Sequence, residues 1–425
     1  MAKGGTVPEK TGPSEGATTR AVGADRGTTR GEPAALDRDV FRLDTAASSG
    51  LGRQLGERIR SDGPLTFAAF MEAALYDAAL GYYRRGVATV GRDGDYLTSP
   101  EVDPLFGYTI GALAASVWEA LERPERFVLR DVGGGSGALL ESALRWATVQ
   151  QPEFAAALWG EIVERSAPDR ERQARRLGPL SERVVWMGDV AEGEPVRGLI
   201  VANELLDAQP VHRLQWEGGG WHELYVGLSA EGGFADRAGP VSEARLLEPL
   251  AEVEAREGQI VEVCPMVGAL VESLAGTLEQ GVLALFDYGY RRARLYASWR
   301  RRGTLMTFYR HTAGEDPYQR VGEQDLTAHV DVDAVLAAGA AAGLSAYGLQ
   351  SQAEFLSAMG ATAMEGVAEG TVARGGSVET YLSRRRAVEM LTDPGGLGRI
   401  QVMALGQGVE AAVMGLGAAF LEAGR

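Results

Sequence analysis

The sequence predicts an α/β fold: a Rossmann-like sheet with helices on both faces, an N-terminal helical lid region and a helical insertion. Two observations support this prediction. The apolar strand Phe127–Leu129 leads through Asp131 into a glycine-rich loop, Gly133–Gly137, and after a helix a second strand ends at Glu164. Later segments continue the alternation of strand and helix, which is typical of a parallel sheet.

The glycine-rich loop and Glu164 together predict a site for a nucleotide-type cofactor. Glycines after a strand allow the backbone to turn tightly and approach a ligand, while the following helix offers free N–H groups. An acidic residue ending the next strand can bind both ribose hydroxyls. A flexible loop is the alternative, because the chain contains 57 Gly, but the flanking strand and acid favour the cofactor site.

The order of the glycines separates two classes of cofactor. The loop reads G-G-G-S-G, whereas dinucleotide folds usually contain G-x-G-x-x-G. It is closer to the D/E-x-G-x-G-x-G pattern of enzymes that use S-adenosylmethionine, so methyl transfer is favoured over hydride transfer. The residues expected to bind this cofactor are Asp131, Gly133, Gly135, Gly137 and Glu164.

Composition argues against several other classes of protein. The 425 residues carry a formal net charge of -16, so there is no general basic field that would hold nucleic acid. The single cysteine, Cys264, and four scattered histidines form no disulfide or metal-binding pattern. No apolar run reaches about 18 residues, and the N-terminus lacks a signal-peptide core. We therefore expect a soluble, cytoplasmic protein without metal, membrane or nucleic-acid partners.

The first 125 residues divide into two regions. Residues 1–48 are poor in large apolar side chains, so we expect a disordered tail, with a mitochondrial presequence as a minor alternative. Residues 49–125 are expected to form a helical region that contains a lid at 81–101, where aromatic, hydroxyl and carboxylate side chains crowd between glycines. A turn-rich connector is the alternative for that segment. The lid candidates are Tyr83, Asp95, Thr98, Ser99 and Glu101.

The third strand, Val184–Trp186, is followed by Asp189 and Val190. In this fold the end of the third strand meets the adenine, so Asp189 could accept a hydrogen bond from its exocyclic amine and Val190 could donate one from its backbone. Equally, Asp189 could cap a turn.

The fourth strand, Gly198–Ala202, ends in Asn203 and Glu204, and Asp207 follows three residues later. Ligands bind at the carboxyl ends of parallel strands, so we expect these three side chains to face the methyl donor. The alternative is that Asn203 caps a turn and that both acids are solvated near a helix N-terminus, where negative charge is favourable.

The remaining chain is expected to complete the core, 126–350, with an insertion around 211–275. The insertion should contain a hairpin and then a helical segment over about Ser242–Leu274, interrupted near Gly258–Pro265. The fifth and sixth strands are expected at Val282–Phe286 and Leu344–Leu349.

The C-terminal region, 351–425, is Ala- and Gly-rich and is expected to be helical at 353–367 and again at 404–421. Before it, several arginines cluster within 291–302; a solvated surface is favoured for them over a binding site.

Several motifs together resemble the MidA-like family of S-adenosylmethionine-dependent methyltransferases. They cover the chain from about residue 51 to the sixth strand, and several are specific to the family. The motifs are Gly63–Phe67, Phe70-Met71, Leu75-Tyr76, Gly81–Tyr83, Gly94–Tyr96, Thr98–Glu101, Ala202–Glu204 with Asp207, Asp287–Gly289 and Asp325–Asp331.

The resemblance implies a class I methyltransferase fold and protein arginine methylation; the family includes mitochondrial respiratory complex I assembly factors. The family's first motif looks like E-x-G-x-G-R-G, whereas this chain has Asp131 at the acidic position and Ser136 where an arginine is usual. These differences indicate a divergent member of the family.

An arginine acceptor requires carboxylates, because a guanidinium is always cationic in water and must be oriented and then lose a proton. Glu204 and Asp207, with Asn203 beside them, are the first candidates, and Glu101 is the second. A protein or peptide acceptor is expected, and a homodimer is compatible with the sequence. Two alternatives are a methyltransferase of a small molecule or modified peptide, and a non-catalytic assembly factor that retains only the fold.

Overall fold

The computed structural model describes residues 49–360, except 86–90 and 92–93, and residues 378–410. The tail expected at 1–48 lies outside the described residues, as do parts of the expected lid. None of the described helices is long and apolar enough to cross a membrane.

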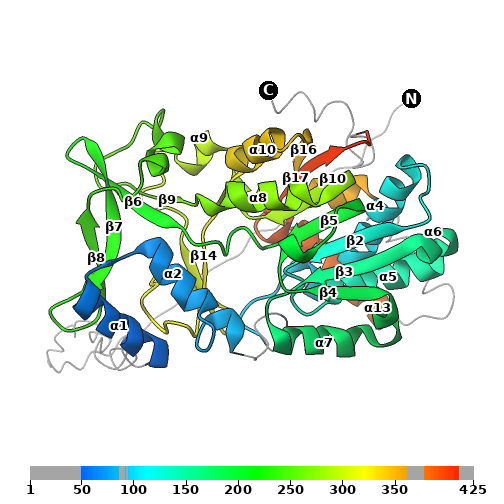
Figure 1. The fold of residues 1–425 in the computed structure, drawn as a ribbon, viewed down its shortest axis with the longest axis horizontal. Helices are drawn as coiled ribbons and strands as arrows, with labels where there is room; N and C mark the ends of the chain where they lie inside the picture. The colour runs from blue at the N-terminus through cyan, green and yellow to red at the C-terminus, as the bar shows by residue number, and fades with distance from the viewer. Residues whose placement is uncertain (1–48, 86–90, 92–93, 361–377, 411–425) are drawn as a thin grey trace, which may run out of the picture. The chain divides into compact units, whose positions relative to one another are not determined.

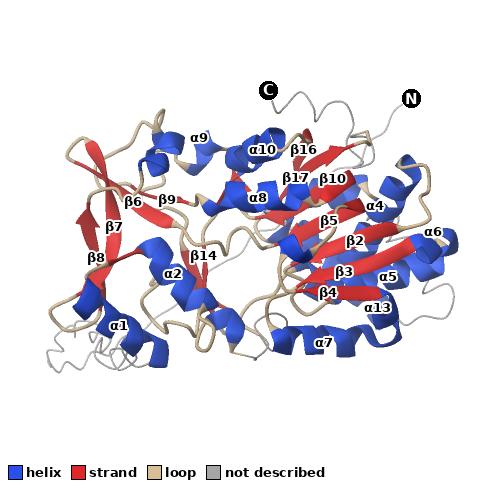
Figure 2. Ribbon diagram, in the orientation of Figure 1, coloured by secondary structure: helices blue, strands red, loops and turns tan. Residues whose placement is uncertain are grey.

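A seven-stranded sheet forms the core, and the α/β prediction is confirmed (Figures 1 and 2). The strand order is β16-β17-β10-β5-β2-β3-β4. β4, β3, β2, β5 and β10 are parallel, whereas β17 runs antiparallel to both β10 and β16. The bounds are β2 Phe127–Val132, β3 Leu158–Val163, β4 Val184–Met187, β5 Val196–Asn203, β10 Leu278–Asp287, β16 Ser345–Ser351 and β17 Gln401–Gln407.

Two apolar layers cover the two faces of this sheet. Neighbouring residues of one strand alternate between them: Leu199 packs in one layer and Ile200 in the other. Because both faces are buried, the central strands are nearly continuous apolar runs. One layer contains α4 Leu105–Ala120, α5 Ala138–Gln150, α6 Pro152–Ala157, α11 Gln352–Ala358 and α13 Val378–Thr392; the other contains α8 Met266–Gly276 and α10 Val332–Ala341.

The prediction of a helix at 404–421 is wrong for residues 404–407, which belong to β17, the strand between β10 and β16. Residues 411–421 lie outside the described part. β17 is buried on both faces and contains Ala and Gly, so it shows neither the alternation of a half-exposed strand nor β-branched enrichment. The helix predicted at 353–367 begins as expected and ends at Ala358 in α11; residues 361–367 lie outside the described part.

The insertion contains a second sheet (Figure 2). The predicted hairpin is present as β6 and β7. The interruption predicted near Gly258–Pro265 contains a strand, β9, which pairs with β6; before it the predicted helical segment is only a 3-10 turn at Ala244–Leu250, and after it α8 begins at Met266. β9 is only four residues long, and its partner lies far away in the sequence, so no local pattern indicates it. The strand order is β1-β7-β6-β9, with β8 on β7: β1 Leu65–Thr66, β6 His212–Glu217, β7 Gly220–Leu228, β8 Phe234–Gly239 and β9 Ile260–Val263.

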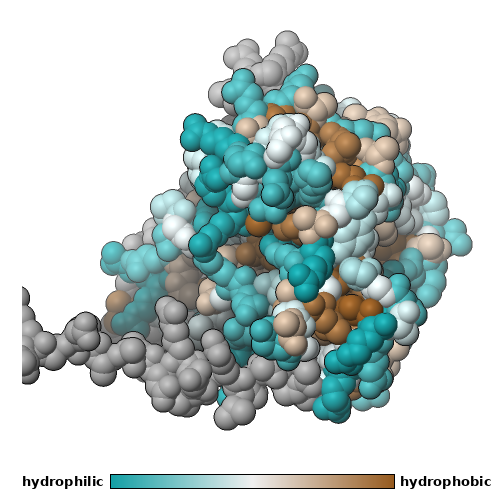
Figure 3. Space-filling model, turned by 90° about the vertical axis from the view of Figure 1, so that its left-hand side faces the viewer, coloured by the Kyte–Doolittle hydropathy of each residue, from teal (hydrophilic) through white to brown (hydrophobic). Residues whose placement is uncertain are grey.

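The two N-terminal helices pack on this second sheet. α1 (Gly50–Asp62) and α2 (Phe67–Tyr76) share an apolar cluster with Val211 and Val226. The Thr66 side chain accepts a hydrogen bond from the Ala69 N–H at 3.1 Å, so it caps α2. Figure 3 shows that this side of the molecule is mostly hydrophilic, with small separate hydrophobic areas.

Short elements complete the structure, and five short strands form a two-stranded and a three-stranded sheet. The 3-10 turns are Tyr82–Arg84, Gly178–Arg183, Val190–Glu192, Ala244–Leu250 and Leu397–Arg399. The short helices and α7 are α3 Ser99–Val102, α7 Ala167–Leu177 and α9 Arg292–Leu295. The short strands are β11 Gly289–Tyr290, β12 Met306–Tyr309, β13 Thr312–Gly314, β14 Asp325–Thr327 and β15 Val330–Asp331.

Candidate active site

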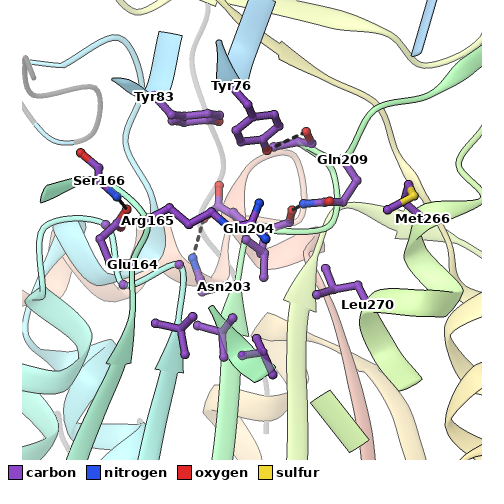
Figure 4. Close-up of a pocket in the computed structure, with 18 of the residues that line it drawn as sticks. Tyr76, Tyr83, Glu164, Arg165, Ser166, Asn203, Glu204, Gln209, Met266 and Leu270 are labelled. Atoms are coloured by element: carbon purple, nitrogen blue, oxygen red, sulfur yellow. Dashed lines mark hydrogen bonds between the residues drawn. The ribbon is translucent and has the colours of Figure 1, made fainter. Parts of the chain in front are cut away.

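A cavity of about 810 Å³ lies at the carboxyl ends of β2, β3, β4 and β5, as expected for a doubly wound sheet (Figure 4). Most of the predicted site residues line it. These are Tyr83, Thr98, Glu101, Asp131, Gly133, Gly135, Glu164, Asp189, Val190, Asn203 and Glu204. Gly137, Asp95, Ser99 and Asp207 are not part of its lining.

The glycine-rich loop adopts backbone conformations that favour glycine. Gly133, Gly135 and Gly137 have φ values of 73°, 52° and 83°. A Cβ on Gly133 would also lie 2.9 Å from a methyl group of Leu205. Gly137 precedes the first residue of α5, so its role is to start that helix beside the cavity.

Glu164 is held at the end of β3 by two hydrogen bonds with backbone groups of other residues. Its N–H donates to the Met187 carbonyl at 2.8 Å, and its Oε1 accepts from the Ser166 N–H at 2.8 Å. Burial raises the pKa of this carboxyl group. Figure 4 shows Glu164 and Ser166 on one side of the cavity, facing the side where Asn203 and Glu204 lie.

Asp131 lies almost fully buried beneath the loop. Its Oδ2 has no hydrogen-bond partner in the described part of the chain. Burial and the nearby charge of Glu164 raise its pKa to about 7. A buried acceptor without a partner is costly, so this oxygen fits a ligand that brings a hydrogen-bond donor.

Asp189 caps a turn, which was the alternative role considered for it. Its Oδ1 accepts from the Ala191 N–H at 3.1 Å, and its Oδ2 pairs with Arg165 at 2.6 Å. These contacts lower its pKa. The side chain still lines the cavity beside Val190, so the predicted contact with adenine stays a prediction.

Four carboxylates gather at the ends of β5 and β10, and we call them the acid cluster: Glu204, Asp207, Asp287 and Asp325. Asp287 Oδ2 accepts from the N–H groups of Leu206 at 2.7 Å and of Leu205 at 3.1 Å, which fixes the loop after β5. Glu204 adopts the left-handed conformation, with a φ of 50°. Such strain in a non-glycine residue is often found at functional sites.

The protein environment favours the protonated form of the acid cluster. Burial and then the charge of Asp287 raise the pKa of Glu204 to about 8. Burial also raises the pKa of Asp287 and of Asp325 to about 7, and that of Asp207 well above its usual range. Glu204 Oε1 accepts from the Asn203 side chain at 3.1 Å and from the Ser99 N–H at 3.4 Å.

A second cavity of about 610 Å³ meets the first at three residues. Tyr83, Tyr96 and Glu204 line both cavities, whereas Asp207 and Asp325 line only the second. Tyr83 donates from its hydroxyl to Asp325 at 2.8 Å. Glu204 therefore lies where the cofactor cavity meets a second cavity, which is lined by Asp207 and Asp325 and also by arginines.

Two of the lid candidates have structural contacts instead of lining a cavity. Asp95 accepts from the Tyr82 hydroxyl at 2.9 Å and from the Arg310 N–H at 2.7 Å, which joins the lid to the chain after β12. Ser99 donates to Gln352 at 2.8 Å. Both residues are buried, so they hold the lid in place.

Sequence reasoning did not select several residues of the site. Asp287 ends the fifth strand, so the strand-end rule applied to Glu204 could also have identified it. Asp325 lies in a recognised family motif, but its approach to Tyr83 depends on the fold. Tyr76 lies in the quoted motif Leu75-Tyr76 but was not selected as a site residue, and Gln209 and Met266 gave no signal in the sequence (Figure 4). Arg84 also lines the cavity without such a signal. Within the described ranges, no three or more His, Cys, Asp or Glu side chains are arranged so that they could hold a metal ion.

A methyltransferase family profile matches residues 109–350, more than half of the chain. Its description is "S-adenosyl-L-methionine-dependent methyltransferase", and the protein belongs to this family. It is therefore an enzyme that uses S-adenosylmethionine as methyl donor. The resemblance to MidA-like methyltransferases found in the sequence is confirmed.

Named relatives and a solved structure agree. "Protein arginine methyltransferase NDUFAF7, mitochondrial" of Mus musculus is 31% identical over 302 residues, 66% of this chain and 67% of the relative. The homologue of Drosophila melanogaster is 28% identical over 91% of both chains. A methyltransferase-like COG1565 protein of Burkholderia thailandensis bound to S-adenosyl-homocysteine has a TM-score of 0.79 and 31% identity, and the match covers 87% of this chain and 94% of that one.

The expectation of a cytoplasmic protein is wrong. The relatives from mouse, fly and frog are mitochondrial by name.

The described site fits the methyl donor. The unpartnered Oδ2 of Asp131 can accept from the ammonium group, Glu164 can accept from the ribose hydroxyls, and the Gly133–Gly135 backbone allows close approach.

Proposed function

We propose that the protein methylates an arginine side chain of a protein acceptor. The observation that supports this most directly is the acid cluster at the junction of the two cavities. In the described part of the chain, no Lys, Arg or His forms an ion pair with any of its four carboxylates. Buried acids without a cation are unfavourable, so the site is suited to a cation supplied by the acceptor.

A guanidinium fits this requirement better than an ammonium group. It is planar, stays charged, and can donate paired hydrogen bonds to a carboxylate. Glu204 faces the cofactor cavity, while Asp207 and Asp325 line only the acceptor side. The names of the relatives from mouse and fly, protein arginine methyltransferases, support the same acceptor.

The proposed steps use the carboxylates of Glu204 and Asp207. The bound donor supplies an electrophilic methyl group on a sulfonium. Asp207 and Glu204 orient the guanidinium so that one nitrogen faces that methyl group in line with the breaking C–S bond. The charge of the bound guanidinium lowers the pKa of Glu204, so its carboxylate is ionised before the transfer. As the N–C bond forms and the C–S bond breaks, Glu204 accepts the proton that the nitrogen releases. The two tyrosines above the strand ends, Tyr76 and Tyr83, help to keep water away from the reacting atoms (Figure 4).

A transfer assay tests the proposal. The full chain is incubated with S-adenosylmethionine labelled in the methyl group and with mitochondrial extract proteins. The labelled products are hydrolysed, and the methylated amino acids are identified by mass spectrometry. We expect methylarginine, which should be lost in Glu204→Gln and retained in Glu171→Gln, an exposed control on α7. A labelled product without methylarginine would contradict an arginine acceptor.

A further inference from the structure

Aromatic rings and guanidinium groups pack together at one wall of the second cavity. The His329 ring stacks on the Tyr288 ring with centroids 6.1 Å apart, and it contacts the tilted Tyr290 ring at 5.3 Å. The Arg399 Cζ lies 5.3 Å from the Tyr288 centroid, and the Arg300 Cζ lies 5.0 Å from that of Tyr290. We call these five residues the stacked wall; four of them line the cavity, and Tyr290 supports Arg300 without lining it.

The two arginines of the stacked wall differ from other arginines beside the same cavity. Arg302 pairs with Glu315 at 3.1 Å, and Arg213 pairs with Asp236 at 2.7 Å. In contrast, neither Arg300 nor Arg399 forms an ion pair with a carboxylate of the described residues, and the buried Arg300 Nε has no hydrogen-bond partner. Stacking on an aromatic face orders a guanidinium but leaves its in-plane N–H donors free.

Arg300 and Arg399 give this wall positive charge. Burial first, and then the charges of Arg399 and Arg300, lower the pKa of His329 to about 4, and its buried Nδ1 has no partner among the described residues. The carboxylates Glu204, Asp207 and Asp325 line the same cavity and supply the opposite charge. The cavity therefore offers carboxylates for a cation and two arginines for an anion.

We propose that the stacked wall binds a carboxylate of the acceptor, supplied by an Asp or Glu a few residues from the methylated arginine. The inference rests on the proposed function, since it assumes that the acceptor arginine reaches the acid cluster through this cavity. Arg300 and Arg399 are already held by Tyr290 and Tyr288, so little ordering is needed when the carboxylate binds. The sequence favoured a solvated surface for the 291–302 arginines; Arg300 instead lies half-buried in the cavity wall.

Short peptides test the proposal. Each is a blocked Gly/Ala peptide with one Arg and one Glu placed one to three residues before or after it, and each has a Gln counterpart. Binding to the full chain saturated with S-adenosyl-homocysteine is measured by calorimetry, and methyl transfer is followed separately. At one or more positions the Glu peptide should bind about tenfold more tightly than its Gln counterpart, with the gain in KM and not in kcat.

Matched variants separate the stacked wall from general charge. Arg300→Gln and Arg399→Gln should each remove most of the preference for Glu. Arg294→Gln should retain it, because Arg294 stacks on the same Tyr290 ring at 4.8 Å but does not line the cavity. Equal binding of Glu and Gln peptides at every position, or an equal preference in all three variants, would overturn the proposal.

Two further results test the proposed function and the class of anion separately. Tighter binding of Glu peptides without any methyl transfer would support the carboxylate site and contradict the proposed function. A phosphoserine peptide that binds far more tightly than its Glu counterpart would overturn a carboxylate as the ligand class.

Discussion

The cofactor edge and the acid cluster hold their polar groups in different ways. At the cofactor edge, Asp131, the glycine-rich loop and Glu164 come from one strand–loop–helix–strand unit, and Glu164 is fixed by the nearby Ser166 N–H. The acid cluster depends on distant partners: Asp287 holds the loop at Leu206, and Tyr83 donates to Asp325 across 242 residues of sequence.

This difference indicates how the two regions should respond to substitution. The cofactor edge is a local unit, so a change there should weaken the binding of the donor. The acid cluster collects buried charges that are costly without a cation, so a change there should affect the acceptor and the proton. Four predictions test this separation, beginning with the largest expected effect.

Glu204→Gln should lower methyl transfer by a factor on the order of 10² or more, as is typical when a positioned proton acceptor is lost. Its affinity for S-adenosylmethionine should stay unchanged, because Gln keeps the shape of the side chain at the junction of the two cavities and still offers a hydrogen-bond acceptor. Single-turnover transfer and calorimetry measure the two quantities. Full turnover by this variant would show that Glu204 does not accept the proton. A loss of donor affinity would contradict the separation between the cofactor edge and the acid cluster.

Glu164→Ala should show the opposite pattern. Loss of the carboxylate that faces the ribose should weaken S-adenosylmethionine binding by about 1–3 kcal/mol, while turnover at saturating donor should change little. Calorimetry with Glu171→Ala as the exposed control measures the effect. An unchanged dissociation constant would show that Glu164 does not bind the donor.

The cofactor edge could be predicted from sequence because each of its parts has a local signal. Glycines after a strand, an acid at the next strand end, and apolar runs that reflect burial on both faces are visible within 38 residues, from Phe127 to Glu164. The strand-end rule also found Asn203 and Glu204.

The strands β17 and β9 and the surroundings of the acid cluster could not be predicted in the same way. A strand that is buried between two neighbours, like β17, shows no alternation of apolar and polar residues and so resembles a helix in sequence. The strand β9 is too short to be distinguished from a break in a helix. The meeting of Tyr83 with Asp325 and the stacking around His329 depend on how distant segments pack. Residue types alone do not indicate which of them become neighbours.

The pH dependence of stability should also differ between the wild type and the acid-cluster variant. The pKa values of Asp131, Asp287 and Asp325 are raised to about 7 and that of Glu204 to about 8. The folded protein therefore keeps these protons at pH values where the unfolded chain has lost them. The free energy of unfolding should fall as pH rises from about 4.5 to about 8.

Glu204→Gln should reduce this fall by on the order of 1 kcal/mol, since water in the cavities weakens the effect of burial. Urea unfolding at pH 5, 6.5 and 8 measures it, with Glu171→Gln as the control that keeps the wild-type slope. An identical slope in both variants would mean that Glu204 is ionised throughout the range in the absence of ligand.

The smallest expected effect concerns Arg176, which joins the lid to the glycine-rich loop. Its Nη1 lies 3.2 Å from Glu101 and 2.5 Å from the Ser136 hydroxyl, and its Nε donates to Glu141 at 2.9 Å. Ser136 occupies the position where the resemblance to MidA-like methyltransferases implies an arginine. The guanidinium of Arg176 therefore supplies, from α7, a positive charge beside the loop.

Arg176→Ser should weaken S-adenosylmethionine binding about threefold, because the Arg176 side chain is 36% exposed and its ion pairs are partly screened. The double variant Ser136→Arg with Arg176→Ser should recover most of this affinity. Residue 136 lies next to Glu101, so an arginine there can place its guanidinium beside the same carboxylate. Arg175→Ser on the exposed face of α7 is the matched control. If the double variant binds no better than Arg176→Ser, the contact with Glu101 depends on the direction from which Arg176 approaches, and the lid and the donor site are not coupled through charge alone.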